Sequence, residues 1–182
     1  MNFISKILFR ITSLFPIKKE WKEIEYFDSK WENRVKKMAG FILPFESIMD
    51  IGCGQMSLKK FLTTNKYIPV DYKKRDDETI ICDFNKYEFP KINADVAFIS
   101  GCLEYIHDYR WLANKVCHSC NKVILSYCAI EEFPSLNERR KNYWVNHLSF
   151  DSIISLFKEN GFELSKSTNL DTKDRIMVFT KL

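Results

Sequence analysis

From residue 47 onward, two patterns of apolar positions alternate along the chain. Short apolar segments that end in a polar residue are typical of buried β-strands, and apolar residues that recur every three or four positions are typical of amphipathic helices. The expected strands are 47–51, 67–71, 79–83, 94–100, 122–127, 162–164 and 175–179. The expected helices are 56–62, 108–118 and 150–160. The hydrophobic pattern therefore predicts an α/β protein.

The order of these elements indicates how the strands pair. Strands that alternate with helices need crossover connections, which give a mainly parallel sheet. The segment that joins the last two expected strands, 165–174, is polar and too short for a helical crossover. We therefore expect the strands at 162–164 and 175–179 to be antiparallel neighbours.

The N-terminal part of the chain carries helical periodicity but no strand pattern. The apolar residues of 1–15 form one stripe, and 18–39 predicts a second helix, or two short ones, that ends at Gly40. We expect a helical cap at 1–40 followed by the main domain at 41–182, within one globular unit. The first stripe packs on this domain or on a partner, lies on a membrane surface, or belongs to a mobile tail.

Composition narrows the class of protein. A chain of 182 residues that is 46% hydrophobic can build a single domain with a proper core. The net charge of +4 is mild and not clustered, so it gives no clear nucleic-acid signal. The six cysteines are Cys53, Cys82, Cys102, Cys117, Cys120 and Cys128. We expect them to be free thiols and the protein to be cytoplasmic. Peripheral contact with a membrane through the first helix is the alternative for its location.

Candidate chemistry lies where the expected strands end. Asp50, Asp71, Asp83 and Ser100 each follow a run of apolar residues. Ligands of open parallel sheets bind at the carboxyl ends of the strands, and a buried carboxylate is costly unless it meets a partner or a ligand. Asp71 lies about 20 residues after the first strand end, the position from which a carboxylate holds ribose hydroxyls in nucleotide-binding α/β folds.

A glycine turn follows the first of these strands. Gly52 and Gly54 remove side chains where the backbone must turn tightly and approach a ligand closely. Residues 47–54, Ser-Ile-Met-Asp-Ile-Gly-Cys-Gly, resemble the first motif of the class I S-adenosylmethionine-dependent methyltransferases. Segments 82–84, 94–106 and 146–164 are similar to later segments of that family, in the same order. The family's third glycine is absent here, because Gln55-Met56 stands in its place.

This resemblance covers about residues 45–182 and implies both a fold and a cofactor. The implied fold is a Rossmann-like three-layer sandwich around a mostly parallel seven-stranded sheet with an antiparallel last strand. The implied cofactor is S-adenosylmethionine, which leaves as S-adenosylhomocysteine. The residues implied in cofactor binding are Asp50, Gly52, Cys53, Gly54, Gln55, Asp71, Tyr72, Asp83, Phe84, Ser100, Gly101, Cys102 and Tyr105. Within this set Asp71 would hold the ribose, and Tyr72 would lie beside the adenine. Asp83 would hold the adenine amino group, and Asp50 would lie near the methionine amino group.

The acceptor is less defined than the cofactor. His107 and His147 are candidate general bases, with Glu104 and Tyr105 as weaker ones. Segment 129–145 carries a basic and aromatic cluster of Arg139, Arg140, Tyr143 and Trp144. We expect this cluster to hold an anionic acceptor such as a phosphorylated or carboxylated sugar, with a solvated charged loop as the alternative.

The class of acceptor is narrowed by a missing motif. Residues 100–103 are Ser-Gly-Cys-Leu, not the Asn/Asp-Pro-Pro-Tyr/Phe tetrapeptide of amino-methylating nucleic-acid enzymes. A small molecule or a saccharide, methylated on oxygen, is therefore the expected acceptor, while protein or RNA stays open. The sequence does not predict an oligomeric state.

Three other functions were weighed. A protein with this fold could bind the cofactor without catalysis. An NAD-type Rossmann oxidoreductase is disfavoured because Ser57 stands where its fingerprint has a last glycine or alanine, and because no second domain remains. Cys117 and Cys120 have the spacing of half a zinc site, but the second half is missing, so we expect no metal.

Overall fold

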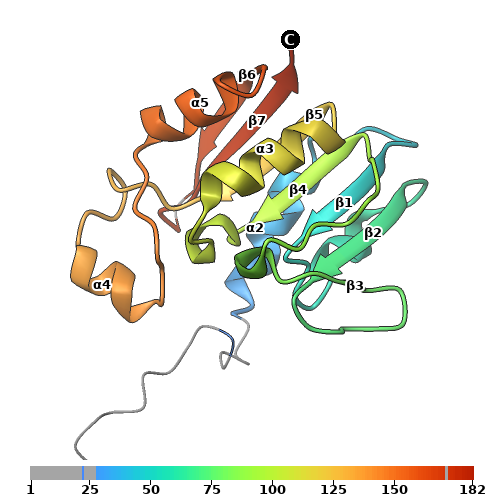
Figure 1. The fold of residues 1–182 in the computed structure, drawn as a ribbon, viewed down its shortest axis with the longest axis horizontal. Coiled ribbons are helices and arrows are strands. Elements are labelled where there is room, and N and C mark those ends of the chain that lie inside the picture. Colours follow the sequence, from blue (N-terminus) through green and yellow to red (C-terminus); the bar gives the residue numbers. More distant parts are fainter. Residues whose placement is uncertain (1–21, 23–27, 171) are drawn as a thin grey trace, which may run out of the picture.

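The computed structural model describes residues 22, 28–170 and 172–182 (Figure 1). Its strands are β1 (Ser47–Ile51), β2 (Lys66–Asp71), β3 (Ile80–Ile81), β4 (Val96–Ser100), β5 (Lys122–Tyr127), β6 (Phe162–Asn169) and β7 (Arg175–Lys181). They form one seven-stranded sheet in the order β3-β2-β1-β4-β5-β7-β6. Strands β1 to β5 are parallel, and β7 runs antiparallel to both β5 and β6. The predicted mostly parallel sheet with an antiparallel closing pair is confirmed.

Helices cover both faces of this sheet. Helices α3 (Tyr109–Ser119) and α5 (Phe150–Lys158) lie on one face, as Figure 1 shows, and their apolar side chains form one core with alternate residues of the strands. On the other face, Val35 and Met38 of α2 (Lys30–Ala39) pack with Ile48 and Phe98 of the sheet. The 3-10 helix η2 (Ser57–Phe61) contributes Leu58 to this second core. The result is the predicted three-layer sandwich.

Two helices begin at side chains that satisfy otherwise unpaired backbone N–H groups. Asp108 precedes α3 and accepts a hydrogen bond from the Trp111 N–H over 3.0 Å. Ser149 precedes α5 and accepts one from the Ser152 N–H over 3.0 Å. Aspartate and serine favour this position because their side chains can reach the first turn. These caps fix where the helices that follow β4 and precede β6 begin.

Some boundaries differ from those predicted. The strand expected at 162–164 continues to Asn169, with an irregularity between Leu164 and Lys166. Its polar extension is exposed at the edge of the sheet, where no apolar alternation is needed. The helix expected at 56–62 is the short η2, which begins after Met56 in a left-handed conformation (φ 55°).

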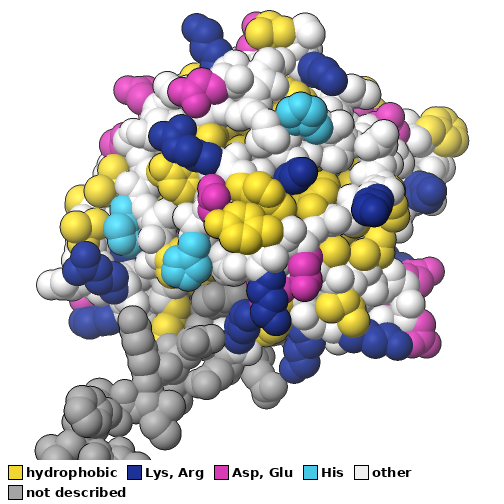
Figure 2. Space-filling model, viewed as in Figure 1, with side chains coloured by type: hydrophobic (Ala, Val, Ile, Leu, Met, Phe, Trp, Pro, Cys, Tyr) yellow, Lys and Arg dark blue, Asp and Glu magenta, His cyan; other side chains and the backbone are white. Residues whose placement is uncertain are grey.

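The structure describes part of the predicted N-terminal cap. Within the expected 18–39 helix, α2 begins at Lys30, and the stripe at 1–15 lies outside the described residues. Among the described residues no helix is long and apolar enough to cross a membrane. On the face that carries α3 and α5, side chains of both charge signs are interspersed (Figure 2).

Candidate functional site

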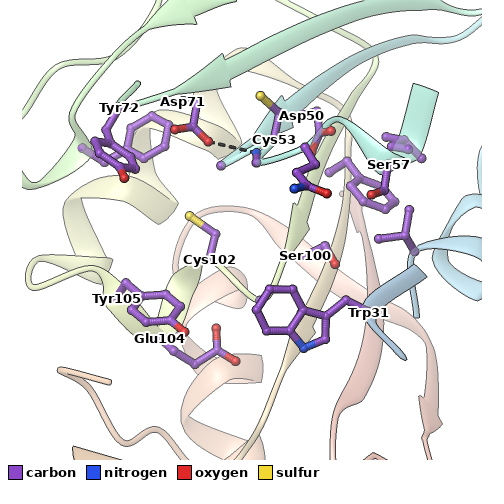
Figure 3. Close-up of a pocket in the computed structure, with 18 of the residues that line it drawn as sticks. Trp31, Asp50, Cys53, Ser57, Asp71, Tyr72, Ser100, Cys102, Glu104 and Tyr105 are labelled. Carbon is purple, nitrogen blue, oxygen red and sulfur yellow. Dashed lines mark hydrogen bonds between the residues drawn. The ribbon is translucent and has the colours of Figure 1, made fainter. Parts of the chain in front are cut away.

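A cavity opens at the carboxyl ends of β1, β2 and β4 (Figure 3); we call it the strand-end cavity. All thirteen residues that the resemblance implied in cofactor binding line it. Figure 3 shows Asp50, Cys53 and Asp71 along one side and Trp31, Glu104 and Tyr105 along the other, with Ser100 and Cys102 between them. Residues from four separate segments of the chain therefore converge on one space.

The glycine turn after β1 forms the tightest part of the cavity wall. Gly52 and Gly54 have φ values of 73° and 52°, a region that side chains rarely adopt. A Cβ atom on Gly52 would lie 2.6 Å from Cys102 Sγ. The backbone N–H groups of Gly52 and Cys53 donate to Val70 O over 2.9 and 3.1 Å, which fixes the turn against β2. A glycine at position 52 is thus required by both conformation and space.

Asp71 ends β2 and is buried at the cavity wall. Its Oδ2 accepts a hydrogen bond from the Gly54 N–H over 2.9 Å. Its Oδ1 accepts from the Lys73 N–H and from Arg75 Nη2, both over 3.1 Å. These three donors hold the carboxylate in a fixed orientation beside the glycine turn.

Asp50 is a buried acid in β1, close to Asp71. Burial raises the pKa of Asp50 to about 7, the hydrogen bond from Tyr67 lowers it, and the charge of Asp71 raises it. The Tyr67 hydroxyl donates to Asp50 Oδ2 over 2.7 Å. A bound cation would favour the charged form of this acid, because an opposite charge offsets the cost of burial. The position suits a ligand ammonium group.

Asp83 belongs to the segment after β3 and lines the strand-end cavity. Its Oδ1 accepts from the Asn85 N–H over 3.2 Å, and its Oδ2 accepts from Lys22 Nζ over 2.6 Å. The Tyr72 hydroxyl donates to the Lys22 backbone oxygen over 3.0 Å. Lys22 therefore lies against both residues that the resemblance implied in adenine binding.

Helix α2 contributes three lining residues that were not predicted from sequence, Trp31, Arg34 and Val35. Arg34 Nε donates to Ser100 Oγ over 3.1 Å, and its Nη1 pairs with Asp174 Oδ1 at 3.1 Å. Gly101 allows this approach, because a Cβ there would lie 2.7 Å from Arg34 Nη2. The sequence signal that could have found Arg34 is its place between Trp31 and Val35, two residues of the apolar stripe of this helix.

Glu104 lies in a 3-10 helix, η4 (Leu103–Tyr105), and is the acid that the cavity buries most deeply, at 2% exposure. Its Oε1 accepts from the Cys128 N–H over 3.0 Å. Its Oε2 is buried and has no hydrogen-bond partner among the described residues. Burial raises the pKa of Glu104 to about 7. Next to it, burial raises the pKa of Tyr105 to about 12, and a hydrogen bond with Trp144 lowers it.

The two histidines that we predicted as bases lie elsewhere. Neither is among the described residues that line the cavity. His107 is exposed, and its backbone N–H donates to Asn85 Oδ1 over 2.9 Å. His147 Nδ1 accepts from Arg139 Nε over 3.0 Å, and burial together with the charges of Arg139 and Arg140 lowers the pKa of His147. Of the four candidate bases named from sequence, Glu104 and Tyr105 are the two that line the cavity.

The predicted basic cluster is also arranged differently. Arg139, in α4 (Leu136–Lys141), is fully buried rather than directed at an acceptor. Its guanidinium donates to Cys128 O over 2.8 Å and to the Tyr127 hydroxyl over 3.2 Å, and it lies 4.8 Å from the centre of the Trp144 ring. Arg140 is exposed and Tyr143 half-buried, and neither is among the described lining residues, whereas Trp144 is. Arg139 thus supports the segment that brings Trp144 to the cavity.

The Cys-x-x-Cys pair has a structural explanation. Cys117 and Cys120 are both buried at the end of α3, within the core beneath that helix. Cys120 Sγ donates to Val116 O over 3.2 Å. The pair lies away from the strand-end cavity, whose described lining includes neither residue.

Comparison by sequence finds no relative. No protein-family model matches the chain, and no curated protein sequence is significantly similar to it.

Comparison by structure finds many similar chains. Magnesium protoporphyrin IX methyltransferase from Synechocystis, with bound S-adenosylhomocysteine, aligns over 98% of this chain and 95% of its own, with a TM-score of 0.66 and 12% identity. A methyltransferase of calicheamicin biosynthesis, also with S-adenosylhomocysteine, aligns over 96% and 67%, with a TM-score of 0.63 and 12% identity. The N1-methyltransferase of 1,6-didemethyltoxoflavin from Burkholderia thailandensis aligns over 84% and 77%, with a TM-score of 0.59 and 14% identity. The chain has the class I methyltransferase fold.

Proposed function

We propose that this protein transfers the methyl group of S-adenosylmethionine to an oxygen atom of a small organic molecule. The observation that carries the proposal is the convergence of Asp50, Asp71 and Asp83 with the Gly52–Gly54 turn on one cavity. The fold of the chain and the S-adenosylhomocysteine in the three methyltransferases named above support the choice of cofactor.

The donor set of the cavity fits this cofactor from one end to the other. Asp83, beside Tyr72, would accept a hydrogen bond from the adenine amino group, and Asp71 would accept from the ribose hydroxyls. The buried acid Asp50 would pair with the methionine ammonium, close to the backbone of Gly52. Each of these ligand groups is a donor or a cation, and each protein partner is a carboxylate, so charge and hydrogen-bonding character match.

The role of the protein in the reaction is mainly alignment. The sulfonium of the cofactor supplies an already activated methyl group. The chain must hold an acceptor atom in line with that group and keep water out of the cavity. Trp31 and Tyr105 line the side of the cavity opposite Asp71, which leaves that side for the acceptor. Trp144 also lines the cavity and forms a hydrogen bond with Tyr105. One of the three structural neighbours contains bound 1,6-didemethyltoxoflavin, a small-molecule acceptor of that enzyme.

Calorimetry separates this proposal from its alternatives. We expect S-adenosylhomocysteine to bind wild-type protein at micromolar concentration and NAD to show no binding. Asp71→Asn should weaken S-adenosylhomocysteine binding at least tenfold, since a neutral amide is a poorer partner for a ribose diol. Asp77→Asn is the matched control, because Asp77 lies in the same loop but its side chain is 98% exposed. Binding of NAD instead would reject the proposal.

Turnover distinguishes an enzyme from a binding protein of the same fold. Incubation with S-adenosylmethionine and small-molecule extract fractions should release S-adenosylhomocysteine from wild-type protein and not from Asp71→Asn. Tight cofactor binding without release in any fraction would favour the non-catalytic alternative.

A further inference from the structure

The side of the strand-end cavity opposite Asp71 has a distinct chemical character. Figure 3 shows the Glu104 carboxyl between the rings of Tyr105 and Trp31, below the Cys102 side chain. Trp144 lines the same cavity and forms a hydrogen bond with Tyr105. Two aromatic rings therefore flank one buried acid and a third lies beside Tyr105, a lining that suits a flat apolar ligand with a single polar group.

Glu104 differs from the other buried groups that lack a full set of partners. Arg75, Glu132 and Arg175 each have one such atom, but each belongs to an ion pair, Arg75 with Asp71 and Glu132 with Arg175. Glu104 forms no ion pair among the described residues, and its Oε2 has no hydrogen-bond partner there. A buried acceptor of this kind destabilises the protein unless a ligand satisfies it.

The neighbouring cation does not serve this purpose. Arg34 lines the same cavity, but its Nη1 already pairs with Asp174 at 3.1 Å and its Nε donates to Ser100. The Glu104 carboxyl is held on its other oxygen by the Cys128 N–H, so Oε2 stays directed away from that contact. The position is fixed, and the missing partner is a hydrogen-bond donor.

We infer that the methyl acceptor is a planar aromatic compound with a hydroxyl group, whose O–H donates to Glu104 Oε2 while its ring lies among Trp31, Tyr105 and Trp144. This inference rests on the proposed function and names the substrate class of the same site. It replaces the anionic sugar expected from Arg139 and Arg140, because Arg139 is buried in contacts of its own and Arg140 does not line the cavity.

The reaction then balances without a further reagent. The acceptor oxygen forms a bond to the methyl carbon, the bond from that carbon to sulfur breaks, and its electron pair stays on sulfur. The hydroxyl proton passes to Glu104 Oε2 and from there to solvent after product release. An aromatic hydroxyl suits a carboxylate base, since its pKa near 10 is far below that of an alkyl alcohol, so proton transfer to the carboxylate costs less.

Three flat probes of similar size test the inference: 2-naphthol, 2-methoxynaphthalene and 2-naphthoate. Their affinities are measured at pH 8, where the Glu104 carboxyl is mainly ionised and Oε2 is an acceptor, by quenching of tryptophan fluorescence on the protein saturated with S-adenosylhomocysteine. We expect 2-naphthol to bind at least tenfold more tightly than 2-methoxynaphthalene, which has no donor, and 2-naphthoate to bind most weakly. Equal affinity for the first two, tightest binding of the anion, or no binding of any probe would overturn the inference.

Glu104→Gln gives the sharper arm of the experiment. Its amide oxygen can keep the Cys128 contact, which turns the NH₂ group toward the cavity and makes it a donor. The variant should then prefer 2-naphthoate to 2-naphthol, and its S-adenosylhomocysteine affinity should stay within twofold of wild type. Glu138→Gln, an exposed change on α4, should keep the wild-type order. An unchanged order in Glu104→Gln would remove the role of Glu104.

Methyl transfer provides the final readout. Wild-type protein should convert 2-naphthol and S-adenosylmethionine to 2-methoxynaphthalene, detected by mass spectrometry, and Glu104→Gln should lose at least 100-fold in rate. The result separates the two proposals: failure of S-adenosylhomocysteine to bind wild type would reject the methyltransferase itself, whereas cofactor binding with no preference for 2-naphthol would reject only the acceptor.

Discussion

Asp71 accepts a hydrogen bond from the Gly54 backbone N–H over 2.9 Å, so the end of β2 holds the turn that follows β1. The same carboxylate pairs with Arg75, whose side chain is 19% exposed. Asp71→Ala would leave that arginine without its carboxylate partner and the turn without its anchor. We expect the free energy of unfolding to fall by about 3–5 kcal/mol. Urea unfolding measures this, and Asp77→Ala, an exposed change in the same loop, should stay near wild type.

The ion pair between Lys22 and Asp83 predicts competition at the adenine end of the cavity. Lys22 Nζ lies 2.6 Å from Asp83 Oδ2, the atom proposed to accept from the adenine amino group. Lys22→Ala removes a competing donor, so S-adenosylhomocysteine should bind two- to fivefold more tightly by calorimetry. Lys60→Ala, which loses an exposed pair with Glu32, is the control. Weaker binding in Lys22→Ala would instead make Lys22 a contact of the cofactor.

Gly52 and Gly161 have similar backbone angles but different surroundings. Substituting each one therefore separates the cost of backbone strain from the cost of a steric clash. Gly52 and Gly161 have φ values of 73° and 79°, but a Cβ on Gly161 meets nothing within 4 Å, whereas one on Gly52 meets Cys102 Sγ. Both alanine variants should lose about 1–2 kcal/mol of stability from the left-handed backbone. Only Gly52→Ala should also lose cofactor affinity, by at least tenfold, because Cys102 or the turn must move. Thermal unfolding and calorimetry on both variants test this; equal cofactor affinity would contradict it.

The half of the cavity proposed for the cofactor was predictable because strand ends fix positions in space. Apolar runs that end at Asp50, Asp71 and Ser100 place these residues at one edge of a parallel sheet, whatever the packing of the helices. Glu104 and Tyr105 follow β4 directly, so the same reasoning reached them. Trp31 and Arg34 were missed because their position depends on how α2 packs against the loop after β4, which local pattern does not specify.

The half proposed for the acceptor was predicted less well, for a related reason. Arg139 stands in a polar segment that is typical of a solvated loop, but its partners, Tyr127 and Cys128, come from the end of β5. Such contacts depend on the path of the chain back to the sheet. The extension of β6 to Asn169 likewise depends on pairing with β7 and not on its own polar sequence.

The burial of Arg139 yields a prediction about stability rather than substrate binding. Arg139→Ala would take the guanidinium donor from the Cys128 and Phe133 carbonyls and would remove the contact with the Trp144 ring. The Tyr127 hydroxyl would keep the Leu148 N–H as its donor. We expect a loss of about 2–5 kcal/mol, since each unsatisfied buried group costs about 1–3 kcal/mol. The exposed neighbour supplies the control, because Arg140→Ala should stay within about 0.5 kcal/mol of wild type. Urea unfolding of the two variants decides between a structural and a surface role.

Two of the buried acids that line the cavity, Asp50 and Glu104, predict how stability depends on pH. Burial raises the pKa of each to about 7, from ordinary values of 3.8 and 4.5. Between about pH 4 and pH 7 the folded protein therefore binds more protons than the unfolded chain. The stability that Asp50 and Glu104 contribute is fully present below about pH 4 and is lost as the pH rises through 7. Each shift corresponds to about 3–4 kcal/mol. The double variant Asp50→Asn, Glu104→Gln lacks both titrations, so its stability relative to wild type should rise between pH 5 and pH 8. Urea unfolding at the two pH values without cofactor measures this difference, and a constant offset between the two proteins would show that neither acid is protonated in the folded state.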